Sequence, residues 1–263
     1  MKRSYKNIVE MIIGQSDIIL EVLDSRLIDL SRNKYFENKI IKNNKILFYV
    51  INKSDLVNLR YLLKKRKEIE NCYIVSCKKK YGIDLLRKKL ISIARKLEKE
   101  KVFIGIIGYP NTGKSSLINA LIRDSKTRTS PVSGFTKGFQ YIKLRRGIYL
   151  IDTPGVYTLN DEFLLALMSA KDWDKISDPE LIAIKMIELL KPFIIRTYEV
   201  KEKESSEMLK EITLKYNYLR KNNEPDLIRG AKKIIRDWQQ GKIYIYDYNL
   251  LDNLIKRLKN DWN

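Results

Sequence analysis

The 263-residue chain contains no histidine and only two cysteines, Cys72 and Cys77. The absence of histidine removes the commonest general base and the commonest ligand of transition metals. Two cysteines are too few for a disulfide framework or a zinc cage, and they indicate a reducing compartment. Any chemistry must therefore use carboxylates, amides, hydroxyls, lysine and bound ions.

Long uncharged apolar runs are also absent. No stretch reaches the ~18 apolar residues that a membrane span needs. The first residues lack the apolar core and the cleavage site of a signal peptide. Hydrophobic residues still make up 44% of the chain, which excludes wholesale disorder and allows a sizeable core. We expect a cytoplasmic protein that works as a monomer away from membranes.

Acidic residues are scarce relative to basic ones. The 52 Lys and Arg outnumber the 32 Asp and Glu, for a net charge of +20. Residues 1–165 hold 33 basic and 16 acidic side chains, whereas residues 166–263 hold 19 and 16. Such a charge attracts phosphate polymers at long range, so we expect nucleic acid as a partner. The alternative is a solvated basic surface without a partner.

Short β-branched runs alternate with helix-compatible stretches over the first two-thirds of the chain. This alternation predicts an α/β fold whose mostly parallel sheet is covered on both faces. After about residue 159 apolar residues recur at helical spacing, which predicts a smaller helical domain. We assign residues 1–165 to the first domain and 166–263 to the second. The expected strands are residues 18–23, 46–51, 73–76, 102–108, 139–144 and 148–151, and the clearest helices are 85–99 and 115–123.

The strongest motif is GYPNTGKSS, which runs from Gly108 to Ser116 between an apolar strand and a helix. This pattern, G-x-x-x-x-G-K-[ST], lets backbone N–H groups surround a polyphosphate at a helix N-terminus. Lys114 is expected to reach the β- and γ-phosphates, and the Ser115 hydroxyl to bind Mg²⁺. The phosphate-binding residues are therefore expected to be Asn111, Thr112, Gly113, Lys114, Ser115 and Ser116.

Two further segments fit the same chemistry. Asp152 and Gly155 follow an apolar strand in the sequence DTPG, so we expect Asp152 to hold Mg²⁺ as a second ligand and the Gly155 N–H to sense the γ-phosphate. Thr136 lies in a turn-rich loop and is our candidate for a further Mg²⁺ ligand that orders with the γ-phosphate. Lys114, Thr136 and Gly155 would then serve catalysis.

An earlier strand ends in Asn52-Lys53-Ser54-Asp55, and the next ends in Ser76-Cys77-Lys78. These segments resemble the N-K-x-D and S-A-K motifs of the GTPase superfamily. The resemblance implies that Asp55 selects guanine by accepting from its ring N–H and exocyclic amine. Asn52 would bond the base or tie loops together, the Lys53 stem would lie across the ring, and Ser76, Cys77 and Lys78 would complete the base pocket.

The order of these motifs is unusual, because N-K-x-D and S-A-K precede the phosphate loop. The chain therefore resembles the circularly permuted GTPases of the YlqF/RbgA-like kind. Asp24-Ser25-Arg26 is similar to the D-A-R segment of that family. The resemblance implies a P-loop GTPase that hydrolyses GTP to GDP and acts in assembly of the large ribosomal subunit through rRNA and ribosomal proteins.

Two features depart from the expected hydrolytic apparatus. Val156 occupies the position after D-x-x-G where Ras-like enzymes have a glutamine, and no histidine is available to replace it. Asn111 resembles the asparagine that holds K⁺ in some GTPases, although it can equally stabilise its own turn. Slow turnover without a ribosomal partner is therefore expected. The alternatives are a GTP-dependent RNA-binding placeholder with negligible turnover and a GTPase of translation or tRNA maturation.

Aromatic side chains in the C-terminal region alternate with cations, which suits either RNA stacking or core packing. The residues concerned are Trp238, Tyr244, Tyr246, Tyr248 and Trp262.

Overall fold

The computed structural model describes residues 5–122, 140–152 and 161–260. It divides into two compact units, Met1–Thr158 and Leu159–Asn263. The boundary lies before the one expected at residue 165, because helix α7 (Glu162–Leu167) packs on helices α8 and α10 of the second unit. Apolar residues 163–167 are all buried there, so this short helix belongs to the helical core.

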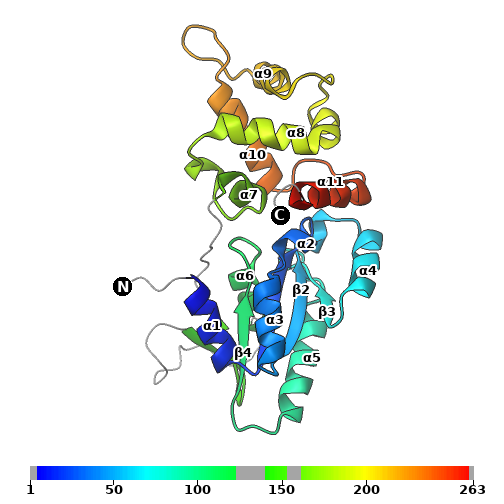
Figure 1. The fold of residues 1–263 in the computed structure, drawn as a ribbon, viewed down its shortest axis with the longest axis vertical. Coiled ribbons are helices and arrows are strands. Elements are labelled where there is room, and N and C mark those ends of the chain that lie inside the picture. The colour runs from blue at the N-terminus through cyan, green and yellow to red at the C-terminus, as the bar shows by residue number, and fades with distance from the viewer. Residues whose placement is uncertain (1–4, 123–139, 153–160, 261–263) are drawn as a thin grey trace. The chain divides into compact units, whose positions relative to one another are not determined.

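The first unit contains a six-stranded sheet in the order β3-β2-β1-β4-β6-β5 (Figure 1). All neighbouring pairs are parallel except β5 with β6, which confirms the mostly parallel α/β fold. The six expected strands are present, with shifts at their ends. The strands are β1 (Ile18–Asp24), β2 (Ile46–Asn52), β3 (Cys72–Ile74), β4 (Val102–Ile107), β5 (Gln140–Arg145) and β6 (Ile148–Asp152).

Helices cover both faces of the sheet, which explains why its central strands are apolar without alternation. One core cluster joins the sheet to α1, α3 and α4, through residues such as Ile12, Ile40 and Leu62. The other joins it to α5 and α6, through Leu86 and Leu121. The helices of this unit are α1 (Tyr5–Gln15), α2 (Ile28–Ser31), α3 (Lys34–Lys42), η1 (Ser54–Leu56), α4 (Leu59–Glu68), α5 (Ile83–Lys96) and α6 (Lys114–Ile122).

Topology gathers the polar motifs at one edge of the sheet. The parallel strands β1, β2, β3, β4 and β6 all end at the same edge, and each expected motif begins where one of them ends. Ligands of open α/β sheets bind outside the carboxyl ends of the strands. The fold therefore places the base-reading and phosphate-reading segments beside one another, despite their separation in sequence.

The second unit is helical, as the sequence predicts. Its longest helix, α8, contains Pro192 and is kinked at Leu190 (φ −104°, ψ 17°), as expected when proline removes a hydrogen bond from the helix interior. Within the described parts of the chain, no helix is long and apolar enough to cross a membrane. After α7, the elements are η2 (Trp173–Lys175), α8 (Pro179–Tyr198), α9 (Ser205–Lys215), α10 (Leu227–Gln239) and α11 (Tyr248–Asn260).

Candidate nucleotide-binding site

The phosphate loop leaves β4 at Gly108 and enters α6 at Lys114. Asn111 (φ 57°) and Gly113 (φ 99°) have left-handed backbone conformations, which curl the loop. The Thr112 hydroxyl donates to the Tyr109 carbonyl over 2.9 Å and closes the curve. The left-handed conformation of Asn111 agrees with its role as a turn former.

Lys114 is held inside this loop. It is 6% exposed, and its Nζ donates to the carbonyls of Gly108 (2.9 Å) and Tyr109 (2.8 Å). Burial lowers the pKa of Lys114 to about 8, although the nearby Asp152 carboxylate acts in the opposite direction. An ammonium group stripped of water in this way is poised to bind phosphate oxygens strongly.

Asn52 connects the two halves of the site. Its Nδ2 donates to the Thr112 carbonyl over 2.9 Å, and its Oδ1 accepts from the Cys77 N–H over 3.2 Å. The side chain is 2% exposed, so both bonds are shielded from water. Of the two roles left open for Asn52, the structure shows the tie between loops.

Gly113 is required by that tie as well as by its own conformation. A Cβ atom at position 113 would lie 2.2 Å from Asn52 Nδ2. The close approach of the phosphate loop to the end of β2 therefore depends on glycine.

The residues expected to read the base form a second cluster. Ser76 Oγ donates to Asp55 Oδ1 over 2.5 Å and accepts from the Lys79 N–H over 3.0 Å. This fixes one oxygen of Asp55, while the carboxylate as a whole stays exposed. Cys77 is half-buried and its pKa is raised to about 11 by burial, so it is a neutral thiol at pH 7. Lys78 is exposed beside it.

Lys53 has a partner that the sequence analysis missed. Its Nζ lies 2.8 Å from Asp24 Oδ2, and Arg26 also pairs with this carboxylate at 2.9 Å. Burial alone would raise the pKa of Asp24, but the two cations hold it well below its usual range. In β1–β2 pairing Asp24 lies opposite Asn52, so this network fixes the backbone where the N-K-x-D segment begins.

Two side chains with oxygen atoms that could hold Mg²⁺ lie near Lys114. Ser115 is the second residue of α6, and Asp152 ends β6 close enough to influence the pKa of Lys114. Hydroxyl and carboxylate oxygens are the donors that Mg²⁺ prefers, so these two residues fit such an ion. Thr136, Gly155 and Val156 lie outside the described residues.

Comparisons with known proteins agree with this geometry. The RsgA GTPase family model matches residues 23–161, more than half of the chain. A GTP-binding protein of Methanocaldococcus jannaschii is 41% identical over 93% of this chain and 67% of its own. GNP-bound YlqF from T. maritima shares the fold, with a TM-score of 0.64, 22% identity and coverage of 90% of this chain and 94% of that one. This chain belongs to the RsgA GTPase family, with its motifs in circularly permuted order.

Further similarities extend beyond the archaeal relative. The model described as 50S ribosome-binding GTPase matches residues 103–225. Nuclear/nucleolar GTPase 2 of Arabidopsis thaliana is 33% identical over 88% of this chain, and nucleolar GTP-binding protein 2 of Saccharomyces cerevisiae is 31% identical over 88%. The chain spans only 42% and 50% of these two proteins.

A buried carboxyl group lies next to the phosphate loop of this GTPase and was also missed. Glu21 is 1% exposed, and its Oε1 accepts the Asn33 N–H over 2.8 Å. Burial raises the pKa of Glu21 to about 8, and the Tyr109 hydroxyl interacts with the Asn33 side chain. The signal was present in the sequence, because Glu21 interrupts the otherwise apolar start of β1, IILEVL.

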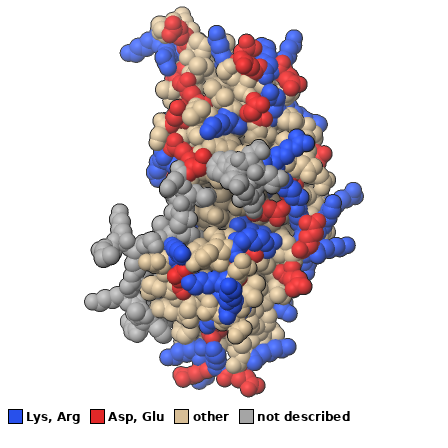
Figure 2. Space-filling view, viewed as in Figure 1, with Lys and Arg blue, Asp and Glu red and all other residues tan. Residues whose placement is uncertain are grey.

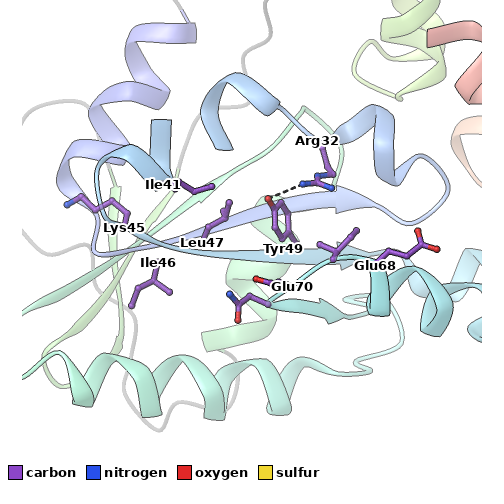
Figure 3. Close-up of a pocket in the computed structure, with 10 residues that line it drawn as sticks. Arg32, Ile41, Lys45, Ile46, Leu47, Tyr49, Glu68 and Glu70 are labelled. Carbon is purple, nitrogen blue, oxygen red and sulfur yellow. Dashed lines mark hydrogen bonds between the residues drawn. The ribbon is translucent and has the colours of Figure 1, made fainter. Parts of the chain in front are cut away.

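The pocket in Figure 3 lies beside the first half of β2, away from Asn52 at the end of that strand. It has a volume of about 420 Å³ and is lined by the first half of β2, including Leu47 and Tyr49, with Glu68 and Glu70 on another side. A strand rises ~3.3 Å per residue, so Leu47 and Asn52 are roughly 16 Å apart. This pocket is therefore distinct from the nucleotide site.

The C-terminal aromatics differ in burial. Trp238 is 1% exposed and donates to the Leu167 carbonyl over 2.7 Å, so it belongs to the core. Tyr244 and Tyr246 are 56% and 41% exposed, and the Arg196 guanidinium lies 5.3 and 4.9 Å from their ring centres. Trp262 lies outside the described residues.

Proposed function

We propose that this GTPase hydrolyses GTP to GDP and phosphate and acts as a nucleotide-controlled switch in large ribosomal subunit assembly. Two findings support the ribosomal role: the match to the 50S ribosome-binding GTPase model and the nucleolar relatives. The excess of basic residues in the first unit favours direct rRNA contact. We propose that the protein works as a cytoplasmic monomer.

The observation that carries this proposal is the pair of hydrogen bonds that the Asn52 side chain forms, one with the phosphate loop and one with Cys77. These contacts keep the end of β2, the phosphate loop and the segment after β3 together, as one nucleotide bound across all three would require. In this proposal Asp55 reads guanine, while Ser76, Cys77 and Lys78 close the base pocket with the Lys53 stem. Phosphates lie against residues 111–116, with Lys114 on the β- and γ-phosphates.

Mg²⁺ would be held by Ser115 and Asp152, with Thr136 completing the protein ligands. When bound, the ion neutralises charge that develops on the phosphates during transfer. The Gly155 N–H would sense the γ-phosphate. Asn111 would serve K⁺ if a monovalent ion is used.

A second candidate function is a GTP-dependent RNA-binding placeholder with negligible turnover. Val156 favours it, since this side chain cannot orient a water molecule. GTP turnover should be measured with and without purified large subunits, in K⁺ and then in Na⁺. Stimulation by subunits supports the switch, and turnover that stays at background with subunits supports the placeholder. Stimulation by small subunits or tRNA instead would favour a role in translation or tRNA maturation.

Base selection can be tested at Asp55. The Asp55→Asn amide presents a donor, so preference should shift from GTP toward xanthosine triphosphate, whose 2-position is an acceptor. Ser76→Ala is the matched control, because it removes the bond to Asp55 but keeps the Asp55 carboxylate, the group that distinguishes the two bases. This variant should lower the affinity for GTP and for xanthosine triphosphate by the same factor. An unchanged ratio in Asp55→Asn would remove this residue from base recognition.

The switch itself can be tested by co-sedimentation with large subunits. Binding should be roughly 5–150-fold tighter with a non-hydrolysable GTP analogue than with GDP, the range of typical allosteric coupling. Thr136→Ala should reduce that ratio. Equal pelleting with both nucleotides would contradict the switch and leave the placeholder function.

A further inference from the structure

Half of the net charge of this GTPase is concentrated in one segment. Residues 59–96 contain 13 Lys and Arg against 3 Asp and Glu, an excess of 10, whereas the whole chain has an excess of 20. This segment comprises α4, β3 and α5, which form the margin of the sheet at its edge strand (Figure 1). Figure 2 shows Lys and Arg projecting at the margin where Figure 1 places α4.

Most of these cations have no anionic partner among the residues that the structure describes. Some basic side chains elsewhere in the chain are paired, as in Lys39–Glu10 and Lys99–Asp17. Lys65 is the buried member of the segment, and it pairs with Asp29 and Glu68. The exposed cations that form no ion pair with any described residue are Arg60, Lys64, Arg66, Lys67, Lys78, Lys79, Lys80, Lys88, Lys89, Arg95 and Lys96.

The cations occupy ordered positions. On α4, exposed Arg60, Lys64 and Lys67 are spaced four and three residues apart, so they lie on one helix face. Three more are presented by residues 78–80, in a loop closed by two backbone bonds of 3.0 Å between Ser76 and Tyr81. A fixed row of cations binds a polyanion with less loss of side-chain and loop entropy than a flexible tail does.

Exposed apolar side chains lie among the cations. Leu59, Leu63, Tyr81 and Leu85 are 49%, 44%, 52% and 59% exposed. The helix expected at residues 85–99 begins earlier, at Ile83, which leaves Leu85 on its outer side. The exposed Tyr81 ring beside cations suits stacking of an unpaired base, and the leucines add apolar surface around it.

We propose that the surface formed by α4, residues 78–81 and α5, the β3-edge surface, binds the backbone of rRNA. This inference rests on the proposed ribosomal function and assigns its RNA contact to one margin of the first unit. An RNA strand presents one phosphate per nucleotide, which matches a long row of unpaired lysines better than the few carboxylates of a protein surface do. Ser76 belongs both to the closed loop and to the Asp55 contact, so bound RNA adjoins the base pocket.

The test is filter binding to rRNA extracted from large subunits, as a function of salt. Lys64→Glu with Lys67→Glu is the first variant, and Lys88→Glu with Lys89→Glu is the second. Arg145→Glu with Arg146→Glu is the matched control, because it makes the same charge change at exposed positions by the opposite edge strand, β5. GDP affinity of each variant checks that the nucleotide site is intact.

We expect each β3-edge variant to lose at least tenfold in RNA affinity at 0.15 M salt. The slope of log affinity against log salt should fall by about 1.4–1.8, for two contacts at ~0.7–0.9 each. In the control variant, the RNA affinity should change by no more than about twofold and the salt slope should stay as in the wild type. Equal losses in all three variants would show diffuse attraction and overturn the inference.

The outcome is separable from that of the proposed function. If wild-type protein does not bind rRNA but large subunits still stimulate turnover, docking uses ribosomal proteins and the inference is wrong while the function stands. If the β3-edge variants lose RNA binding but no subunit ever stimulates turnover, the inference stands and the switch is wrong.

Discussion

Lys114 combines two properties that give nucleotide binding a pH dependence. Its pKa in the free protein is about 8 because the side chain is buried. Bound phosphates add negative charge next to the ammonium group and raise that pKa, so binding takes up a proton when the pH exceeds about 8. GDP affinity should therefore be flat below pH 7.5 and should fall by up to tenfold per unit between about pH 8 and 10.

Titration calorimetry at pH 8.5 in two buffers of different ionisation enthalpy checks this proton uptake directly. Lys114→Arg keeps a cation that does not titrate in this range. The GDP affinity of this variant should be lower than that of the wild type, but it should not change with pH. A wild-type affinity that is constant to pH 10 would contradict the assignment of the low pKa to Lys114.

Glu21 predicts a pH dependence of folding rather than of binding. Its folded pKa of about 8 exceeds the ordinary value of 4.5, so stability from this group is complete below pH 4.5 and is lost as the pH rises through 8. The loss amounts to about 1.4 kcal/mol per pH unit within that window. Nearby, the pKa of Glu37 is lowered and the pKa values of Arg32 and Tyr109 are raised, so these three groups keep their charge state within that window.

Glu21→Gln should remove this slope. The difference in unfolding free energy between variant and wild type, from denaturant titrations at pH 5 and pH 8.5, should change by several kcal/mol in favour of the variant at high pH. A constant difference would mean that Glu21 is already ionised in the folded protein at pH 5.

At the scale of elements, the phosphate loop cannot accommodate a side chain at Gly113. Alanine there meets both a left-handed φ of 99° and the Asn52 amide at 2.2 Å. Gly113→Ala should lower GDP affinity at least a hundredfold while α6 remains folded, as judged by circular dichroism. Adding Asn52→Ala relieves the clash but not the backbone strain, so the double variant should recover only part of the loss. Full recovery would assign the defect to the clash alone.

The strands and the phosphate loop could be predicted from sequence because their signals are local. Strand β1 is an apolar run that only Glu21 interrupts before Asp24 ends it, and in the phosphate loop Gly113 directly precedes the lysine. The contacts of Asn52 with Thr112 and of Lys53 with Asp24 could not be predicted, because they join residues 60 and 29 positions apart. Only the register between strands brings those side chains together.

The domain boundary lies a few residues before the expected one for a related reason. Helix α7 carries an apolar sequence, EFLLAL, that could close either domain. Its assignment to the second unit depends on partners such as Trp238, 71 residues further along the chain. Likewise, the placement of Tyr244 and Tyr246 at the surface follows from their stacking on Arg196 of a distant helix.

At the scale of the whole molecule, the chain is divided by task. Every segment expected to read the base lies before residue 97, and the phosphate loop and Asp152 lie after residue 101. The two sets meet where β1 pairs with β4 and where Asn52 bonds to Thr112. The intervening residues 98–101 are exposed.

This division has a consequence for synthesis. During synthesis β1, β2 and β3 emerge from the ribosome before the phosphate loop does. The nascent chain can therefore form a three-stranded half-sheet before the rest of the sheet is available to pair with it. Co-expressed fragments 1–98 and 99–263 should accordingly associate, and GDP should strengthen their association because it binds to residues of both. Copurification through a tag on one fragment, with and without GDP, measures this directly. Fragments that associate equally well in both conditions would mean that the strand pairing alone, and not the nucleotide, joins the halves.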